Sequence, residues 1–168
     1  MAEAKEIVQL AKLIDAVARR CWRGLPALMG QAPEPTREQM KEAVFYKPKK
    51  DIERVHGGTI EQENGDVKRE IFFIDNIDPL LKAVPWPDLV LTVKWFIKAR
   101  PQDWNMYITL LCNTETARAR WGSRSAAETL AERYGVSVQN VYDVSRGVPR
   151  AIARAASIGI EQLEDISA

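Results

Sequence analysis

The sequence predicts a mainly α-helical fold with a small antiparallel β-hairpin and, near the C-terminus, two short helices joined by a tight turn. Apolar residues recur at three- and four-residue steps along most of the chain, which is typical of amphipathic helices. One segment instead alternates about an Asn-Gly dipeptide, as hairpins do. The 168 residues have the length of one domain, or of one domain with an appendage.

The N-terminal segment predicts an amphipathic helix over residues 4–22. Its apolar side chains fall on one stripe: Ile7, Leu10, Ala11, Ile14, Val17, Ala18 and Cys21. Gly24 and Pro26 end this helix, and a loop rich in proline and glycine follows to Pro35. We expect the stripe to face the core of the protein, with a dimer seam between two copies as the alternative.

Residues 52–74 predict the β-hairpin. Asn64-Gly65 suits a two-residue turn with positive φ. Alternate side chains then share one apolar face: Ile60, Val67 and Ile71. We expect this hairpin to cover a helical core. Contact of the β-ribbon with DNA is the weaker alternative, because its acidic side chains would repel phosphates.

Further helices are predicted where a capping residue or an N-terminal proline precedes an apolar-periodic run. Their starts are marked by Thr36 with Gln39 in capping-box spacing, by Asp78-Pro79, by Asp88 and by Pro101. From these elements we divide the chain into a mixed α/β region, 1–100, and a helical region, 101–168.

Composition excludes several classes of protein. The chain has one histidine, His56, and two cysteines, Cys21 and Cys112, so we expect no His-based catalytic pair, no metal site and no disulfide framework. It has neither a P-loop nor a dinucleotide-binding fingerprint, so we expect no enzyme and no cofactor. Without a long apolar run or a secretory signal, we expect a cytoplasmic chain that does not enter a membrane.

Charge is distributed unevenly along the chain. The net charge is only +1, but residues 94–154 hold ten Lys and Arg side chains against five Asp and Glu side chains. The local balance, 10 − 5, is +5, so the rest of the chain is net negative. This asymmetry predicts that the C-terminal part meets a polyanion.

Residues 125–147 carry the most specific pattern. A Ser-x-x-Glu capping box opens a first helix at Ala126, and Gly135 ends it. Ser137 caps a second helix, which Gly147 ends together with a proline two residues later. Helical periodicity places Ala127, Leu130, Ala131 and Tyr134 inward in the first helix, and Val141 and Val144 inward in the second. Two short helices joined by a glycine-led turn form a helix-turn-helix.

This segment resembles the helix-turn-helix of prokaryotic DNA-binding regulators, a superfamily that includes phage repressors. The family pattern asks for a small residue in the first helix, here Ala131, because a larger side chain would push the second helix away. Four residues later it asks for glycine, here Gly135, because φ is positive at that position. Aliphatic residues complete the pattern: Leu130, Val136, Val141 and Val144.

The resemblance implies that the second helix enters the major groove of double-stranded DNA with its N-terminal half. It places base-edge contacts at Val138, Gln139 and Asp143. The carboxylate of Asp143 would repel phosphate, so we expect it to accept from cytosine N4 or to pair with Arg146. Other outward residues lie near them: Ser137, Asn140, Tyr142 and Arg146. Candidates for phosphate contacts are Arg124, Arg146, Arg150 and Arg154.

From these features we expect a sequence-specific transcription regulator of a phage or mobile element that acts as a homodimer. Residues 1–100 would supply the dimer contact or bind another protein. The alternative is a non-enzymatic adaptor, or a phage or plasmid DNA-recognition subunit, that docks onto RNA polymerase or onto a packaging or replication complex. Specific affinity for DNA in the absence of partners separates the two hypotheses.

Arg146→Ala tests the predicted DNA contact. If Arg146 reads a base, we expect the variant to bind the target sequence about 1–3 kcal/mol more weakly and to lose its preference at one base position. If it holds a phosphate, the loss is uniform across sequences. Titration of matched and mismatched duplexes distinguishes the two results, and unchanged affinity would remove Arg146 from the site.

Overall fold

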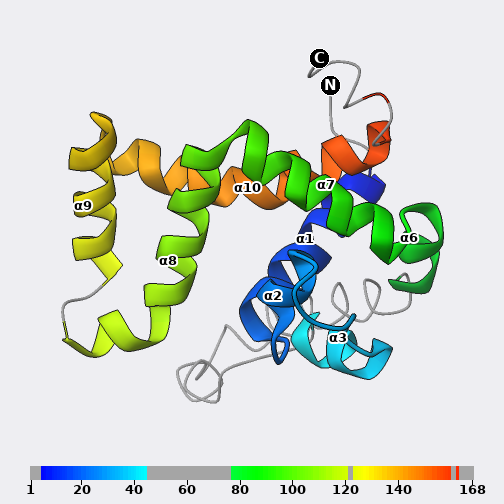
Figure 1. The fold of residues 1–168 in the computed structure, drawn as a ribbon. Coiled ribbons are helices and arrows are strands. Elements are labelled where there is room, and N and C mark those ends of the chain that lie inside the picture. The colour runs from blue at the N-terminus through cyan, green and yellow to red at the C-terminus, as the bar shows by residue number, and fades with distance from the viewer. Residues whose placement is uncertain (1–4, 45–76, 121–122, 160–161, 163–168) are drawn as a thin grey trace, which may run out of the picture. The chain divides into compact units, whose positions relative to one another are not determined.

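The computed structural model describes residues 5–44, 77–120, 123–159 and 162, and within these the side chains of 113–125 are not described. The helices in chain order are α1 (Lys5–Arg20), α2 (Gly24–Leu28), α3 (Arg37–Val44), α6 (Ile77–Ala83), α7 (Trp86–Ala99), α8 (Pro101–Arg120), α9 (Ser123–Tyr134) and α10 (Val138–Ile158) (Figure 1).

The described residues fold only into helices and their connections, so the predicted class with an antiparallel β-hairpin was wrong. No strand occurs in the part of the chain that the structure describes. The Asn64-Gly65 pattern over 52–74 lies outside the described residues. Turn and alternation signals are local, whereas a two-stranded hairpin is marginal unless another strand or a helix covers its apolar face.

The chain divides into two compact units, Met1–Val90 and Leu91–Ala168, referred to here as unit 1 and unit 2. The division falls inside α7, ten residues before the predicted boundary at residue 100.

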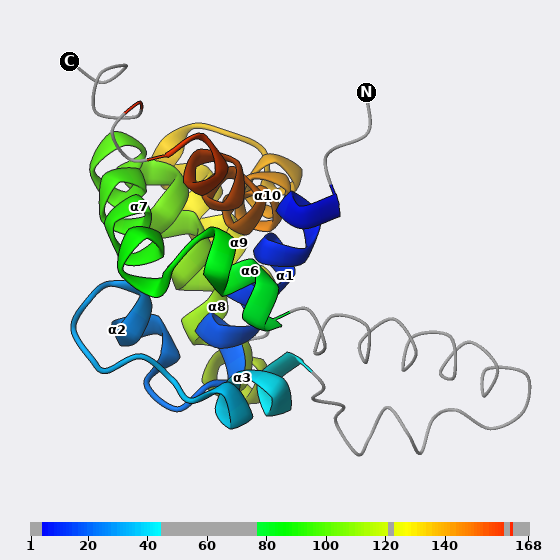
Figure 2. The same ribbon diagram turned by 90° about the vertical axis from the view of Figure 1, so that its right-hand side faces the viewer.

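Unit 1 is organised around α1, which contacts α2, α3 and α6 (Figure 1 and Figure 2). The predicted helix is confirmed as α1, which ends at Arg20, two residues before the predicted end, and most of its apolar stripe is buried. A loop was predicted from Gly24 to Pro35, but its first residues form α2. Proline is tolerated in the first turn of a helix, because the N–H that it lacks has no intrahelical acceptor there.

The predicted capping box at the start of α3 is confirmed. The Gln39 backbone N–H donates to Thr36 Oγ1 at 3.1 Å, and the Thr36 backbone N–H donates to Gln39 Oε1 at 2.9 Å. Arg37, one residue into the box, pairs through Nε with Asp78 Oδ1 of α6 at 2.8 Å. Because α6 begins at Ile77, Asp78 lies in its first turn, where the carboxylate suits the helix dipole, and is not the predicted cap.

Asp88 differs from its predicted role in the same way. The helix α7 already begins at Trp86, so Asp88 lies in its first turn. Four apolar side chains of α7 are buried: Trp86, Leu89, Val93 and Phe96. The predicted start of α8 at Pro101 is confirmed.

Both cysteines are free thiols. Cys21 is half-buried, and its Sγ donates to the Gln39 carbonyl at 3.4 Å. Burial, and to a smaller extent the nearby Glu42 carboxylate, raises the pKa of this thiol to about 11. The Cys21 thiol is therefore protonated at neutral pH. Because only the thiolate is a strong nucleophile, Cys21 serves as a packing residue.

Within the described ranges, no helix is both long and apolar enough to cross a membrane. The same ranges contain no group of three or more His, Cys, Asp and Glu side chains placed to hold a metal ion.

Gly24→Ala tests the packing of α1 against α2. A Cβ at Gly24 would lie 2.0 Å from the Val17 carbonyl oxygen, which is backbone and cannot move away. We expect the variant to lose about 3 kcal/mol in free energy of unfolding, measured by urea titration followed by circular dichroism. The matched control is Gly147→Ala, where nothing lies within 4 Å and a gain of about 0.5–1 kcal/mol is expected. Equal effects of the two substitutions would contradict this packing.

Candidate nucleic-acid interface

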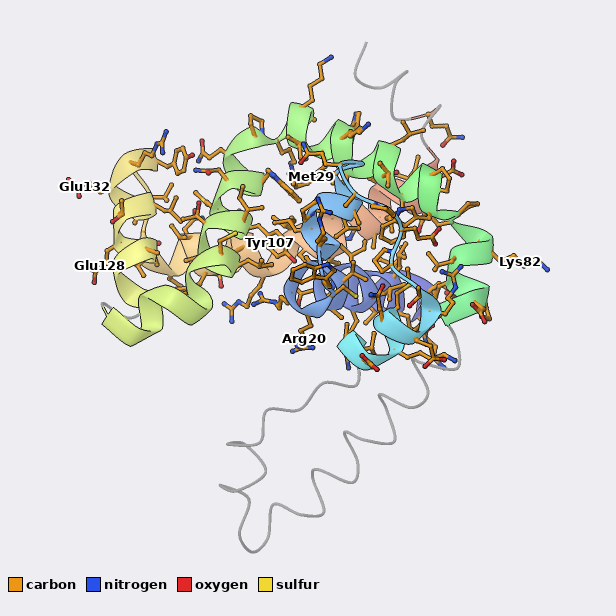
Figure 3. The ribbon with its side chains drawn as sticks, turned by 60° about the horizontal axis from the view of Figure 1, so that its bottom comes forward. Arg20, Met29, Lys82, Tyr107, Glu128 and Glu132 are labelled. Atoms are coloured by element: carbon orange, nitrogen blue, oxygen red, sulfur yellow. The ribbon has the colours of Figure 1, made fainter. Side chains whose placement is uncertain are left out.

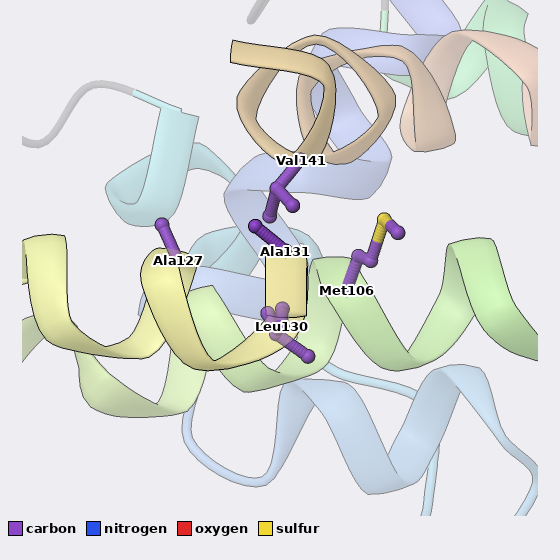
Figure 4. Close-up of a cluster of buried hydrophobic side chains, with 5 residues drawn as sticks. All are labelled: Met106, Ala127, Leu130, Ala131 and Val141. Carbon is purple, nitrogen blue, oxygen red and sulfur yellow. The ribbon is translucent and has the colours of Figure 1, made fainter. Parts of the chain in front are cut away.

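Unit 2 is built on a cluster of buried side chains from three helices, which we call the motif core (Figure 4). Its members are Met106 of α8, Ala127, Leu130 and Ala131 of α9, and Val141 of α10. The sequence predicted four of these five as inward residues of the two motif helices, and their burial is confirmed. Through Met106, α8 packs against both motif helices and supports them.

Ala131 sets how closely α9 and α10 approach. It is 7% exposed and packs in the same cluster as Val141, which is fully buried. A methyl side chain lets the two helices meet, whereas extra methylenes in a packed core cost about 1–3 kcal/mol. The small residue that the family pattern requires therefore lies where the structure needs a small residue.

The turn after α9 is closed by backbone hydrogen bonds around Gly135. The Gly135 N–H donates to the Glu132 carbonyl at 3.4 Å, and the Val136 N–H donates to the Ala131 carbonyl at 3.0 Å. This pair of bonds is the Schellman motif, which needs a left-handed residue at its centre. Gly135 has φ +66°, and a Cβ there would meet nothing within 4 Å. Glycine is therefore required for its backbone conformation, as predicted, and not for space.

Ser137 caps α10 as predicted. Its backbone is extended, and its Oγ accepts from the Asn140 N–H at 3.0 Å. The Val141 N–H donates to the Ser137 carbonyl at 3.1 Å, which begins the helical ladder. The first turn of α10 is thus fixed by a side-chain cap directly after the Schellman turn.

The second motif helix does not end at Gly147 and Pro149 as predicted. It continues as α10 to Ile158, with Pro149 inside it. Proline removes one N–H, the donor to the Ser145 carbonyl, and burial compensates because Val148, Pro149 and Ile152 are all buried. Glycine and proline weaken a helix locally, whereas the packing of its apolar face decides whether it continues.

The first motif helix also begins earlier than predicted, at Ser123 instead of Ala126. The side chain of Ser125 is among those not described, so the capping box with Glu128 lies outside what the structure describes.

A polar contact that the sequence did not predict joins α8 to the end of α9. Asn105 Nδ2 donates to Tyr134 Oη at 2.7 Å, and Thr109 Oγ1 donates to Asn105 Oδ1 at 3.3 Å. The Arg133 guanidinium lies 5.7 Å from the centre of the Tyr134 ring. An Asn and a Thr four residues apart in an otherwise apolar run were the available signal, since such pairs share one helix face.

The predicted contact residues of α10 separate into two groups. Val138 and Tyr142 are half-buried and pack against the motif core, so they contribute to stability as well as to the surface. The others are exposed: Ser137, Gln139, Asn140, Asp143, Arg146, Arg150 and Arg154. The side chain of Arg124 is not described.

Five of the exposed residues form one stripe along α10, which we call the α10 stripe: Gln139, Asp143, Arg146, Arg150 and Arg154. At 3.6 residues per turn these side chains fall within a sector of about 80°. The stripe carries three cations and one anion, a balance of 3 − 1 = +2. Because α10 extends past Gly147 to Ile158, the stripe also includes Arg150 and Arg154.

Asp143 links its neighbours on the stripe. One carboxylate oxygen, Oδ1, accepts from Gln139 Nε2 at 3.0 Å and from Arg146 Nη2. The bond from Gln139, followed by that from Arg146, holds the pKa of Asp143 below its ordinary value. The carboxylate is therefore ionised at neutral pH while remaining 57% exposed.

The outer face of α9 has the opposite charge. Glu128 and Glu132, one turn apart, are exposed and point away from α8 (Figure 3). A polyanion that approaches unit 2 would be repelled by this face and attracted by the α10 stripe.

Comparison of the chain with protein-family models, with curated proteins and with solved structures found no match.

Gly135→Val and Gly135→Asn test the turn as a pair. Valine strongly disfavours positive φ, whereas asparagine tolerates it. We expect Gly135→Val to lower the free energy of unfolding by at least about 1–2 kcal/mol and Gly135→Asn to cost clearly less. Thermal unfolding of both variants measures the difference. Equal stability of wild type and Gly135→Val would contradict the left-handed turn.

Proposed function

We propose that unit 2 binds double-stranded DNA through the N-terminal half of α10, and that the protein is a sequence-specific transcription regulator. The observation that carries this proposal is the exposed polar surface of α10, formed by Gln139, Asn140, Asp143 and Arg146 over a core that fixes the helix from behind. A helix presented in this way fits the major groove, which admits one α-helix.

The chemistry of this surface suits base readout. Amide side chains such as Gln139 and Asn140 can bond adenine N6 and N7, and a guanidinium such as Arg146 can bond guanine O6 and N7. Such contacts need a helix that is held in place, and the Schellman turn and the Ser137 cap fix the backbone at the start of α10. The single charge of Asp143 opposes non-specific attraction and so favours selectivity over general affinity.

Phosphate contacts are proposed for the rest of the helix. Arg150 and Arg154 lie one and two turns beyond Arg146 on the α10 stripe. The 21 residues of α10 span about 31 Å, more than the groove can hold along its width, so these arginines would reach the backbone of the duplex. The amides at the start of α10, next to Ser137, can receive a second phosphate.

The adaptor function remains the second candidate, because Asp143 lies within the α10 stripe. A carboxylate there suits a basic protein surface, such as one on RNA polymerase or on a packaging or replication complex, better than it suits phosphate.

A homodimer would place two copies of α10 on half-sites one helical turn apart, which is the arrangement we propose for the regulator.

Selection of bound fragments from random DNA by the purified full chain tests the proposal. We expect enrichment of a defined sequence at each of two salt concentrations. The logarithm of the association constant for that sequence should fall linearly with the logarithm of the salt concentration. Arg150→Ala should reduce that slope by about one, whereas Lys82→Ala, an exposed cation of α6, should leave it unchanged. Absence of enrichment at low salt would overturn the regulator and favour the adaptor.

A further inference from the structure

We propose that Asp143 is a positioning residue that makes Arg146 selective for guanine in a G·C pair. The inference rests on the proposed function and goes beyond it by naming a base and the side chain that controls its recognition. It starts from the hydrogen bonds that Asp143 accepts from both Gln139 and Arg146.

The geometry fixes a side chain that would otherwise be mobile. The three residues lie at steps of four and three along α10, so they occupy successive turns of one face. Arg146 is 70% exposed and has a long flexible stem, yet its Nη2 is tied to the Asp143 carboxylate. A guanidinium held by one edge presents its other N–H groups in a fixed plane, which lowers the entropy lost on binding.

The donor pattern of that plane matches guanine. A guanidinium has only N–H donors, and guanine offers two acceptors, O6 and N7, on its major-groove edge. Adenine offers one acceptor and the N6 amino donor, which would face another donor.

Charge argues against the simpler role of Arg146 as a phosphate contact. The pair with Asp143 neutralises most of the field of Arg146, whereas phosphate attraction depends on net charge. The bidentate bond to guanine depends largely on donor geometry, so pairing of the cation weakens it less than it weakens attraction to phosphate. The low pKa of Asp143 keeps the pair ionised at neutral pH.

The test measures affinity for the selected DNA and for the same DNA with each guanine changed to adenine. The guanine of interest is the one whose preference is lost in Arg146→Ala. We expect the wild type to prefer it by about tenfold or more and Asp143→Ala to lose most of that preference. Affinity of Asp143→Ala for random DNA should be equal or higher, because a negative charge has been removed.

Two further variants make the result specific. In an Arg146→Ala background, Asp143→Ala should leave base preference unchanged, because the side chain it positions is absent. Glu132→Ala removes the same charge from the outer face of α9 and should alter affinity for all sequences equally (Figure 3). Thermal unfolding of Asp143→Ala should match the wild type, since Asp143 is an exposed side chain.

The inference is overturned if Asp143→Ala strengthens binding to every sequence by one factor, since Asp143 would then be only a repulsive charge. It is also overturned if no guanine in the selected DNA depends on Arg146. Both results leave the proposed function intact, because the wild type still selects DNA. Failure of the wild type to select any DNA overturns the proposed function, and the inference with it.

Discussion

The left-handed turn at Gly135 is the constraint on which the rest of unit 2 depends. It closes α9 with two backbone bonds and directs the chain so that Ser137 can cap α10 within two residues. The direction of α10 is therefore set by backbone geometry before any side chain of the stripe is considered. A different φ at this position would turn Gln139, Asp143 and Arg146 to another direction, even if α9 and α10 both remained helical.

The motif core holds α9 and α10 rigidly in the arrangement that this turn sets. Met106 from α8 packs with Ala131 and Val141, and the Asn105–Tyr134 hydrogen bond joins α8 to the last residue of α9. Recognition of a base edge tolerates little movement, so a helix-turn-helix needs such a support behind it. The apolar residues Val138 and Tyr142 are partly used for this purpose, which leaves the polar residues of the stripe to meet a partner.

Continuation of α10 through Pro149 changes what the surface can do. A helix that ended at Gly147 would carry only the residues proposed to read bases. The longer helix adds Arg150 and Arg154 on the same stripe, so the residues proposed to read bases and those proposed to bind phosphate share one rigid element. Their relative positions are fixed by helical geometry and do not depend on a loop.

The sequence alone determined the local features of this protein. The capping box at Thr36, the cap at Ser137 and the positive φ at Gly135 were predictable, because each depends on a few neighbouring residues whose backbone bonds they satisfy. The inward residues of α9 and α10 were predictable from helical periodicity. These features located the candidate site in the sequence, but the predicted end of its second helix at Gly147 was wrong.

Only the tertiary structure decided where elements end and which side chains meet. Burial of Val148 and Ile152 carries α10 past a proline, and pairing with Arg37 makes Asp78 a bridge between helices. The predicted class with a β-hairpin rested on a local turn and alternation pattern, and such a pattern does not show whether neighbouring strands exist to complete a sheet. The Asp143 cluster depends on side-chain rotamers, and sequence spacing allowed the pair with Arg146 without showing that Gln139 shares the same oxygen.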